Sequence, residues 1–152
     1  MSYDLKTLLK QELDLEFDSF SNADAWNIGY LLRKKADQEK HMITIDITRL
    51  HQQLFHFSLA GTSLDNDEWV RRKTRIVYRF SHSSLYVGTW LKSLGTTIEE
   101  KYLLPESEYA PHGGSFPILI RNTGVIGTVT VSGLAQEEDH DLVVEALSEY
   151  LG

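Results

Sequence analysis

One loop carries the residue types best suited to holding a ligand: the run His112-Gly113-Gly114-Ser115. Adjacent glycines let backbone N–H groups approach a ligand closely or form a concave nest that binds anions. The order His-Gly-Gly is similar to the oxyanion loop of esterases, but the chain has no GxSxG nucleophile turn, so a hydrolase loses its main support. A tight turn leading into a strand is the alternative interpretation of the same four residues.

A second segment is crowded with basic side chains, with Arg71, Arg75 and Arg79 at intervals of four residues. That spacing places the three guanidinium groups on one helix face, where like charges repel unless an anion meets them. A ligand carboxylate or the acidic surface of a neighbouring subunit would supply that anion. The simpler alternative is a solvated face on which Glu68 pairs with Arg72. We favour the first interpretation and place Arg71 and Arg75 in the candidate site.

The six histidines contain no ligand-spaced pair, and the sequence has neither cysteine nor an HExxH motif. Thiol chemistry, disulfides and zinc–thiolate sites are therefore excluded, and no metal site is recognisable. Among the histidines, His112 in the glycine loop and His82 beside the basic segment come first as binding residues, because loops and helix ends are where sites usually lie.

The spacing of apolar residues predicts the elements that would position these groups. Helical periodicity predicts helices at 4–13, from Ser21 to about Lys40, from Asp65 or Asn66 to Phe80, at 84–94 and after Glu137. Alternating or β-branched runs predict strands at 42–48, 51–59, 115–121 and 125–131, with a hairpin turn at Asn122-Thr123-Gly124. Residues 98–104 fit either class, and 105–114 are expected to form a loop. This order predicts an α+β fold, an antiparallel sheet flanked by helices, in a single domain spanning 1–152.

Composition narrows the functional classes. With 152 residues and 41% apolar content, the chain can bury one ordinary core. A net charge of -7 argues against a general nucleic-acid binder, since affinity for phosphate backbones needs clustered positive charge. The first eleven residues lack a long apolar run, which argues against a signal peptide or a membrane span and predicts a cytoplasmic protein.

Several runs of the sequence resemble the UPF0303 group of the wider GlcG/HbpS-like family, whose members are often labelled heme-degrading domains. The resemblance rests on GVIGTVTVSGL, on the following DHDLVVEAL and on the upstream HGGSFPI, and it extends back through AGTSLDNDEWVRRK to Phe17 and Asp24-Ala25-Trp26. It covers nearly the whole chain. It implies a profilin-like or PAS-like sandwich, assembly into homo-oligomers, and heme as one candidate ligand.

Three functions follow from these observations. The first is an oligomeric protein that binds a small anionic ligand, heme being one candidate, at His112, Gly113, Gly114, Ser115, Arg71, Arg75 and His82. The second is a homo-oligomeric interaction module without ligand chemistry, in which any exposed tryptophan could seal subunit contacts. The third is an enzyme acting on a small organic acid. Its acid–base groups would come from Asp46, Asp65, Asp139 and His140, which form no recognisable catalytic constellation.

Overall fold

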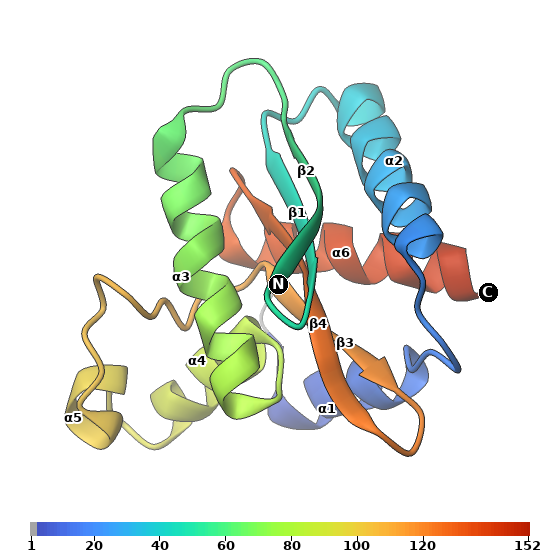
Figure 1. The fold of residues 1–152 in the computed structure, drawn as a ribbon. Helices are drawn as coiled ribbons and strands as arrows, with labels where there is room; N and C mark the ends of the chain where they lie inside the picture. Colours follow the sequence, from blue (N-terminus) through green and yellow to red (C-terminus); the bar gives the residue numbers. More distant parts are fainter. Residues whose placement is uncertain (1–2) are drawn as a thin grey trace.

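A four-stranded antiparallel sheet organises residues 3–152, the part of the chain that the computed structural model describes (Figure 1). Its strands are β1 (Thr44–Arg49), β2 (Gln52–Ser58), β3 (Ser115–Ile120) and β4 (Gly124–Ser132), in the spatial order β2-β1-β4-β3. Each hairpin, β1–β2 and β3–β4, forms between strands that are neighbours in sequence. The pairing of β1 with β4 then joins the two hairpins, with Ile47 opposite Val129.

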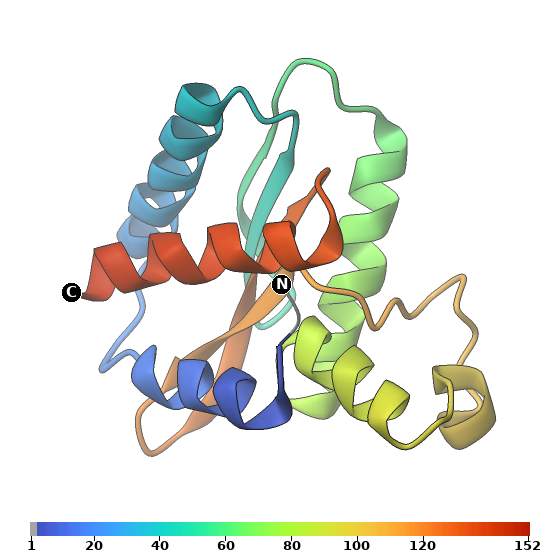
Figure 2. The same ribbon diagram turned by 180° about the vertical axis from the view of Figure 1, so that it is seen from behind.

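Helices cover both faces of this sheet. The helices are α1 (Leu5–Asp14), α2 (Asn22–Glu39), α3 (Leu64–Phe80), α4 (Ser84–Ser93), α5 (Ile98–Tyr102) and α6 (Gln136–Leu151). Figures 1 and 2 show α2 and α6 on one side of the sheet and α3 on the other, with α1 and α4 together at one end. The predicted α+β class, a sheet flanked by helices, is confirmed.

The face of the sheet toward α2 and α6 is apolar. It presents side chains with no exposed surface from three strands: Ile45, Ile47, Phe116, Ile118, Val129 and Val131. Alternation in β1 predicted this face correctly, because a strand's side chains point to opposite sides at every second residue. We refer to it as the apolar face.

The face toward α3 is also buried, but it is lined with hydroxyl groups and one carboxylate. These side chains come from the alternate positions: Thr44, Asp46, Thr48, Ser115, Thr128, Thr130 and Ser132. The hydroxyl oxygens pair across the strands, with 2.8 Å between Thr48 and Thr128 and 2.8 Å between Ser115 and Thr130. Tyr78 of α3 contacts Thr48 from above at 2.7 Å. We refer to this layer as the polar face.

Two local expectations need adjustment. Helix α3 begins two or three residues earlier than predicted, because Ser63 is its N-cap residue and Asn66 accepts the Ser63 N–H through its side chain at 3.0 Å. The segment that fitted either class contains the short helix α5, capped by the Thr97 side chain. The other predicted helices and strands agree with the structure to within a few residues. Among residues 3–152, no helix combines the length and the apolar character needed to cross a bilayer.

Candidate functional site

A cavity of about 350 Å³ opens between α3, the loop before β3 and the start of α6. Helix α3 contributes Asn66, Trp69 and Lys73, whose spacing of three and four residues places them on one helix face. The opposite wall includes His112 and Gln136. We call this space the Trp69 cavity.

The floor of the Trp69 cavity holds a buried ion pair between Lys73 and Asp139. The Lys73 ammonium donates to Asp139 Oδ2 at 3.0 Å and to the Val131 carbonyl at 3.1 Å. Burial lowers the pKa of Lys73 and raises the pKa of Asp139, and in each case the partner's charge opposes the shift. Asp139 also accepts the Leu134 N–H at 2.9 Å. The pair therefore fastens α3 to the segment that leads into α6.

His112 stands beside this pair, in a positive environment. Its ring lies edge-on to Trp69, with centroids 5.8 Å apart. Partial burial lowers the pKa of His112, and the charges of Lys73 and Arg72 lower it further, while Glu106 and a hydrogen bond with the Gln136 side chain oppose part of this shift. The lowered pKa favours the neutral imidazole near pH 7. The Arg72 guanidinium lies 4.4 Å from the Trp69 ring centre and donates to the Glu106 carbonyl at 2.8 Å. The cavity thus presents an uncharged imidazole and an aromatic ring under the influence of two cations.

Gly113 and Gly114 allow neighbouring segments to pack closely, because a side chain at either position would collide with them. A Cβ atom on Gly113 would lie 2.2 Å from the Gln136 carbonyl oxygen, and one on Gly114 would lie 2.6 Å from Lys73 Nζ. The Gly113 N–H donates to Gln136 Oε1 at 2.9 Å, so this donor is already used within the chain. Ser115 is buried on the polar face, where its N–H donates to Ser84 Oγ at 3.0 Å. Within the loop, His112 is the residue that lines the cavity.

The two predicted arginines point to a different partner. Arg71 Nη1 lies 2.6 Å from Glu108 Oε2, and Arg75 pairs with the same oxygen. Glu68 pairs with Arg71 at 2.7 Å, so the pairing of Glu68 with Arg72, considered as the simpler alternative, is wrong. The chain itself supplies an anion to this face of α3, which explains how the clustered guanidinium groups are tolerated. The structure places both arginines outside the lining of the Trp69 cavity.

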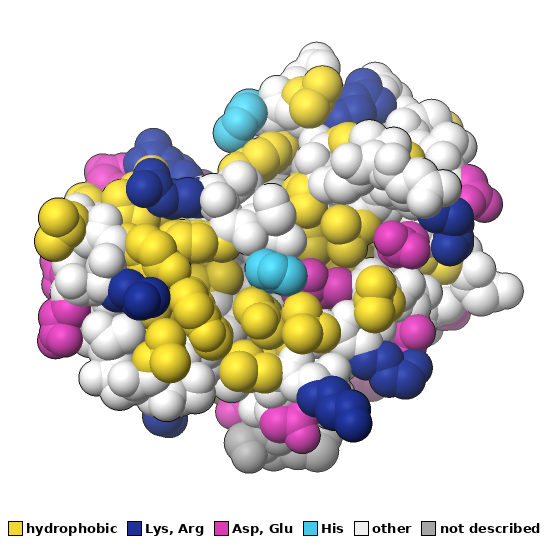
Figure 3. All heavy atoms as spheres, turned by 90° about the horizontal axis from the view of Figure 1, so that it is seen from below, with side chains coloured by type: hydrophobic (Ala, Val, Ile, Leu, Met, Phe, Trp, Pro, Cys, Tyr) yellow, Lys and Arg dark blue, Asp and Glu magenta, His cyan; other side chains and the backbone are white. Residues whose placement is uncertain are grey.

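His82 belongs to another region, where α1 meets α4. Its Nδ1 lies 2.8 Å from Glu12 Oε1, and this contact raises the pKa of His82. His82 also lines a hollow of about 230 Å³ with Tyr86, Trp90 and other aromatic residues. Figure 3 views the molecule from the side of α1, α4 and α5 and shows hydrophobic side chains gathered on that face. The structure therefore separates His82 from His112.

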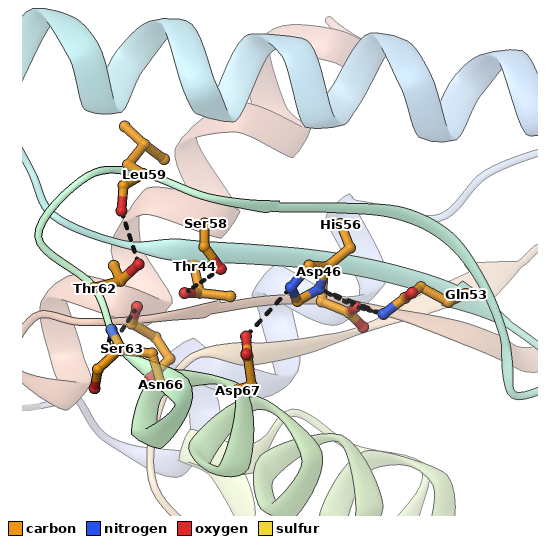
Figure 4. A network of polar contacts seen from close by, with 11 residues as sticks. Thr44, Asp46, Gln53, His56, Ser58, Leu59, Thr62, Ser63, Asn66 and Asp67 are labelled. Atoms are coloured by element: carbon orange, nitrogen blue, oxygen red, sulfur yellow. Dashed lines mark hydrogen bonds and ion pairs between the residues drawn. The ribbon is translucent and has the colours of Figure 1, made fainter.

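A further polar cluster joins β1, β2 and α3 (Figure 4). His56 Nδ1 lies 2.9 Å from Asp46 Oδ1, and His56 Nε2 lies 3.2 Å from Asp67 Oδ1. Gln53 donates to the same Asp46 oxygen at 2.7 Å. Sequence reasoning missed this cluster, because His56 and Asp46 face each other only through the β1–β2 register.

The four acid–base groups considered for an enzyme do not converge. Asp65 and Asp139 line the Trp69 cavity, whereas Asp46 is held by His56. His140 is buried, with its Nε2 2.7 Å from Gln11 Oε1, and burial lowers its pKa to about 4.

Sequence reasoning also missed the α3 residues of the Trp69 cavity. The intervals of three and four residues between Asn66, Trp69 and Lys73 indicate that they share one helix face. The prediction instead used Arg71 and Arg75, which lie on the opposite side of the helix.

Comparisons with known proteins agree on the family. The family model described as "Haem degrading protein HbpS-like" matches residues 20–148. A UPF0303 protein of Streptomyces coelicolor is 49% identical over 95% of this chain and 92% of its own length. A UPF0303 protein of Rhizobium meliloti is 48% identical over 98% of this chain and 91% of its own length.

Solved structures share the same fold. The crystal structure of the Ybr137w protein superposes with a TM-score of 0.89 at 34% identity, covering 100% of this chain and 92% of that one. The structure titled as a PduOC:heme complex has a TM-score of 0.71 at 18% identity, covering 86% of this chain and 94% of that one, a level that shows the fold alone. On the extent of the family match and the identity to its relatives, this chain belongs to the HbpS-like family, among proteins named UPF0303.

Proposed function

We propose that the protein binds a small planar molecule with a negative charge in the Trp69 cavity. The observation that carries this proposal is the environment of His112. Burial and the charges of Lys73 and Arg72 disfavour a proton on its imidazole. The same two cations would attract an anion placed next to it, in competition with Asp139, which already pairs with Lys73. The aromatic ring of Trp69 offers a surface for a flat ligand.

The size of the cavity limits the ligand. A volume of about 350 Å³ lies near the lower end of the range of about 300–1,000 Å³ that small-molecule sites span. A substituted aromatic acid therefore suits the space within a single chain. The buried Lys73–Asp139 pair keeps the floor fixed, so binding would not require the ligand to order it.

Heme is one ligand of this class, and the family connection makes it a natural probe. HbpS-like family membership and the heme complex of the distant PduOC structure support testing it. The residues fit in kind: the neutral imidazole of His112 can ligate iron, and the Arg72 and Lys73 cations suit propionate groups. A porphyrin is bulkier than the single-chain cavity, so it would need the cavity to extend, for example across a subunit boundary.

Titration with benzoate, indole-3-acetate and hemin tests the proposal. Calorimetry follows the two small acids, and absorbance follows hemin. We expect saturable binding of at least one probe, weakened tenfold or more by His112→Ala and by Trp69→Ala. His82→Ala and Arg71→Ala serve as matched controls and should bind as the unmodified protein does, because both residues lie outside the cavity. Absence of binding by all three probes, or equal binding by His112→Ala, would contradict the proposal.

A second proposed function, assembly into a homo-oligomer, is supported by the surface beside the sheet edge. Strand β2 has a neighbour on one side only, and its sequence QQLFHFS contains neither proline nor an acidic or lysine side chain that would guard an open edge. Trp26 and Tyr30 of α2 stand beside it with 63% and 58% of their surfaces exposed. A second copy of the chain would cover these rings.

Light scattering of the eluting protein tests the assembly. We expect a mass of two or more chains, and Trp26→Glu should shift it toward the monomer while leaving ligand binding in the Trp69 cavity intact. A monomeric protein, or an unchanged assembly in the variant, would remove this role from the α2–β2 surface. The cytoplasmic location remains a prediction from the sequence.

A further inference from the structure

Two cavities of this protein share lining residues. The first is the Trp69 cavity, and the second, of about 400 Å³, lies between α4, α5 and the loop before β3. Both are lined by His112 and Gln136. We call the second space the Leu91 cavity, after a residue of its floor.

The two spaces differ in chemistry. The Trp69 cavity is lined by polar and charged groups, which include Asn66, the Lys73–Asp139 ion pair and the Asp65 carboxylate. The Leu91 cavity has an apolar floor made of Leu85, Leu91, Ile98 and Pro111, three of which are almost fully buried. The hydroxyl groups of Thr96 and Thr97 and the charged groups of Lys92 and Glu137 also line it. A ligand that filled both spaces would need a polar head and an apolar tail.

One side chain shared by the two linings is that of Gln136. Its Oε1 accepts the Gly113 N–H at 2.9 Å, and the side chain also hydrogen-bonds to His112. Gln136 is the first residue of α6 and its surface is exposed, whereas its backbone carbonyl is pressed against Gly113. The backbone is thus fixed by packing, and the side chain can rotate away by giving up the hydrogen bonds to Gly113 and His112. His112, the other shared residue, packs edge-on against Trp69.

We propose that Gln136 is a partition that sets ligand length, and that the site accepts a planar carboxylate bearing an apolar chain, with the carboxylate near Lys73 and the chain in the Leu91 cavity. This inference rests on the proposed function of the Trp69 cavity and names the ligand class for it. The driving force for the tail is removal of apolar surface from water against Leu85, Leu91 and Ile98.

Binding of benzoate, 4-butylbenzoate and 4-octylbenzoate, measured by calorimetry, tests the inference. In the unmodified protein we expect the butyl chain to strengthen binding at least tenfold over benzoate. In Gln136→Ala the ratio of alkylbenzoate affinity to benzoate affinity, both measured in that variant, should rise a further fivefold or more. Gln38→Ala, an exposed glutamine of α2 outside both cavities, is the matched control and should behave as the unmodified protein.

A blocking variant locates the tail. Thr89→Phe places a ring in the Leu91 cavity from α4 and should abolish the gain from the alkyl chain while leaving benzoate binding unchanged. Circular dichroism confirms that each variant is folded. If benzoate binds but the alkyl chain adds nothing, or adds as much in Thr89→Phe, the inference is overturned and the proposed function stands. If neither benzoate nor its alkylated forms bind, both fail.

Discussion

The two faces of the sheet are equally buried but are stabilised in different ways. On the apolar face, Ile45 and Val129 need only contact with other apolar groups, since the gain comes from removing their surface from water. On the polar face, Thr130 must find partners for its hydroxyl, and it finds them in Ser115 and Thr74. The comparison shows that burial alone does not define a core. The apolar face is stabilised by apolar side chains that fill the interior, and the polar face is stabilised by hydrogen bonds between its side chains.

The cavity opens at the edge of the polar face, which follows from this difference. Apolar side chains are stabilised by packing against one another and away from water. Hydroxyl and carboxylate groups can also form hydrogen bonds with solvent or with a ligand, so a polar layer can extend to the surface. Ser132 and Asp139 stand at that margin, and both line the Trp69 cavity. Four sets of substitutions test the contrast between the faces.

The largest effect is expected for Phe116→Ala on the apolar face. Phe116 has no exposed surface, so truncation leaves a cavity and should lower the free energy of unfolding by about 4 kcal/mol. Urea denaturation measures the loss. Phe57→Ala, the same change on the edge strand where the ring is partly exposed, is the control and should cost much less. Equal losses at the two positions would contradict a core centred on Phe116.

Lys73→Met tests pairing at the margin of the polar face. It leaves the buried Asp139 carboxylate without its cation and should cost about 3 kcal/mol. The double variant Lys73→Met, Asp139→Asn removes the buried charge while keeping an acceptor for the Leu134 N–H, and it should recover part of the loss. The same denaturation curves apply. No recovery in the double variant would mean that the charge of Asp139 is not the cause.

His140 should make the free energy of unfolding depend on pH. It packs next to the apolar face, where its ring centroid lies 5.8 Å from that of Phe116. Its pKa falls from 6.5 to about 4 on folding, because burial disfavours the charged ring. A lowered pKa means that the unfolded chain binds the proton first. Stability is therefore complete above pH 6.5 and declines as the pH falls toward 4. At about 1.4 kcal/mol per pKa unit, the loss reaches about 3 kcal/mol.

Comparison with His140→Gln isolates this contribution. The free energy of unfolding of the variant should fall less than that of the unmodified protein between pH 7 and pH 4.5. His82 acts in the opposite sense, since Glu12 raises its pKa and its contribution is present below pH 6.5 and lost as the pH rises through the raised value. It is common to both proteins and cancels in the difference. Parallel pH profiles would refute the assignment to His140.

The smallest effects are expected from exchanging a hydroxyl for a methyl group, or the reverse, at adjacent positions of β4. Thr130→Val removes a hydroxyl that Ser115 and Thr74 contact, and it should cost about 1–2 kcal/mol. Val129→Thr places a hydroxyl without a partner on the apolar face and should cost a similar amount. Thermal unfolding detects both shifts. A stabilising Thr130→Val would show that the hydroxyl pairs add nothing beyond filling space.

Much of the fold was predictable, because local sequence patterns specify most of its helices and strands. Alternation in β1 placed Ile45 and Ile47 on the buried side, and β-branched residues marked β4. The start of α3 was misplaced by two or three residues, since Ser63, Asp65 and Asn66 are all good cap residues and only the backbone conformation selects among them.

The candidate site was predictable only in part. His112 was singled out and does line the cavity, but Arg71 and Arg75 turn toward Glu108, more than thirty residues later in the chain. The sequence of α3 contains no signal that Glu108 is the partner of these arginines. Lys73 went unnoticed as a site residue because a lysine among arginines on an amphipathic helix is normally solvated, and its burial depends on Asp139.

By itself the sequence determined the elements, the alternation within strands and the family, all of which depend on residues close together or on runs of identity. The tertiary structure alone decided that the hydroxyl side of the sheet would be covered by α3, and that Trp69, His112 and Gln136 would surround one space. The reason is physical: periodicity specifies which side chains share a face. What covers that face depends on pairing and packing between segments far apart in the chain.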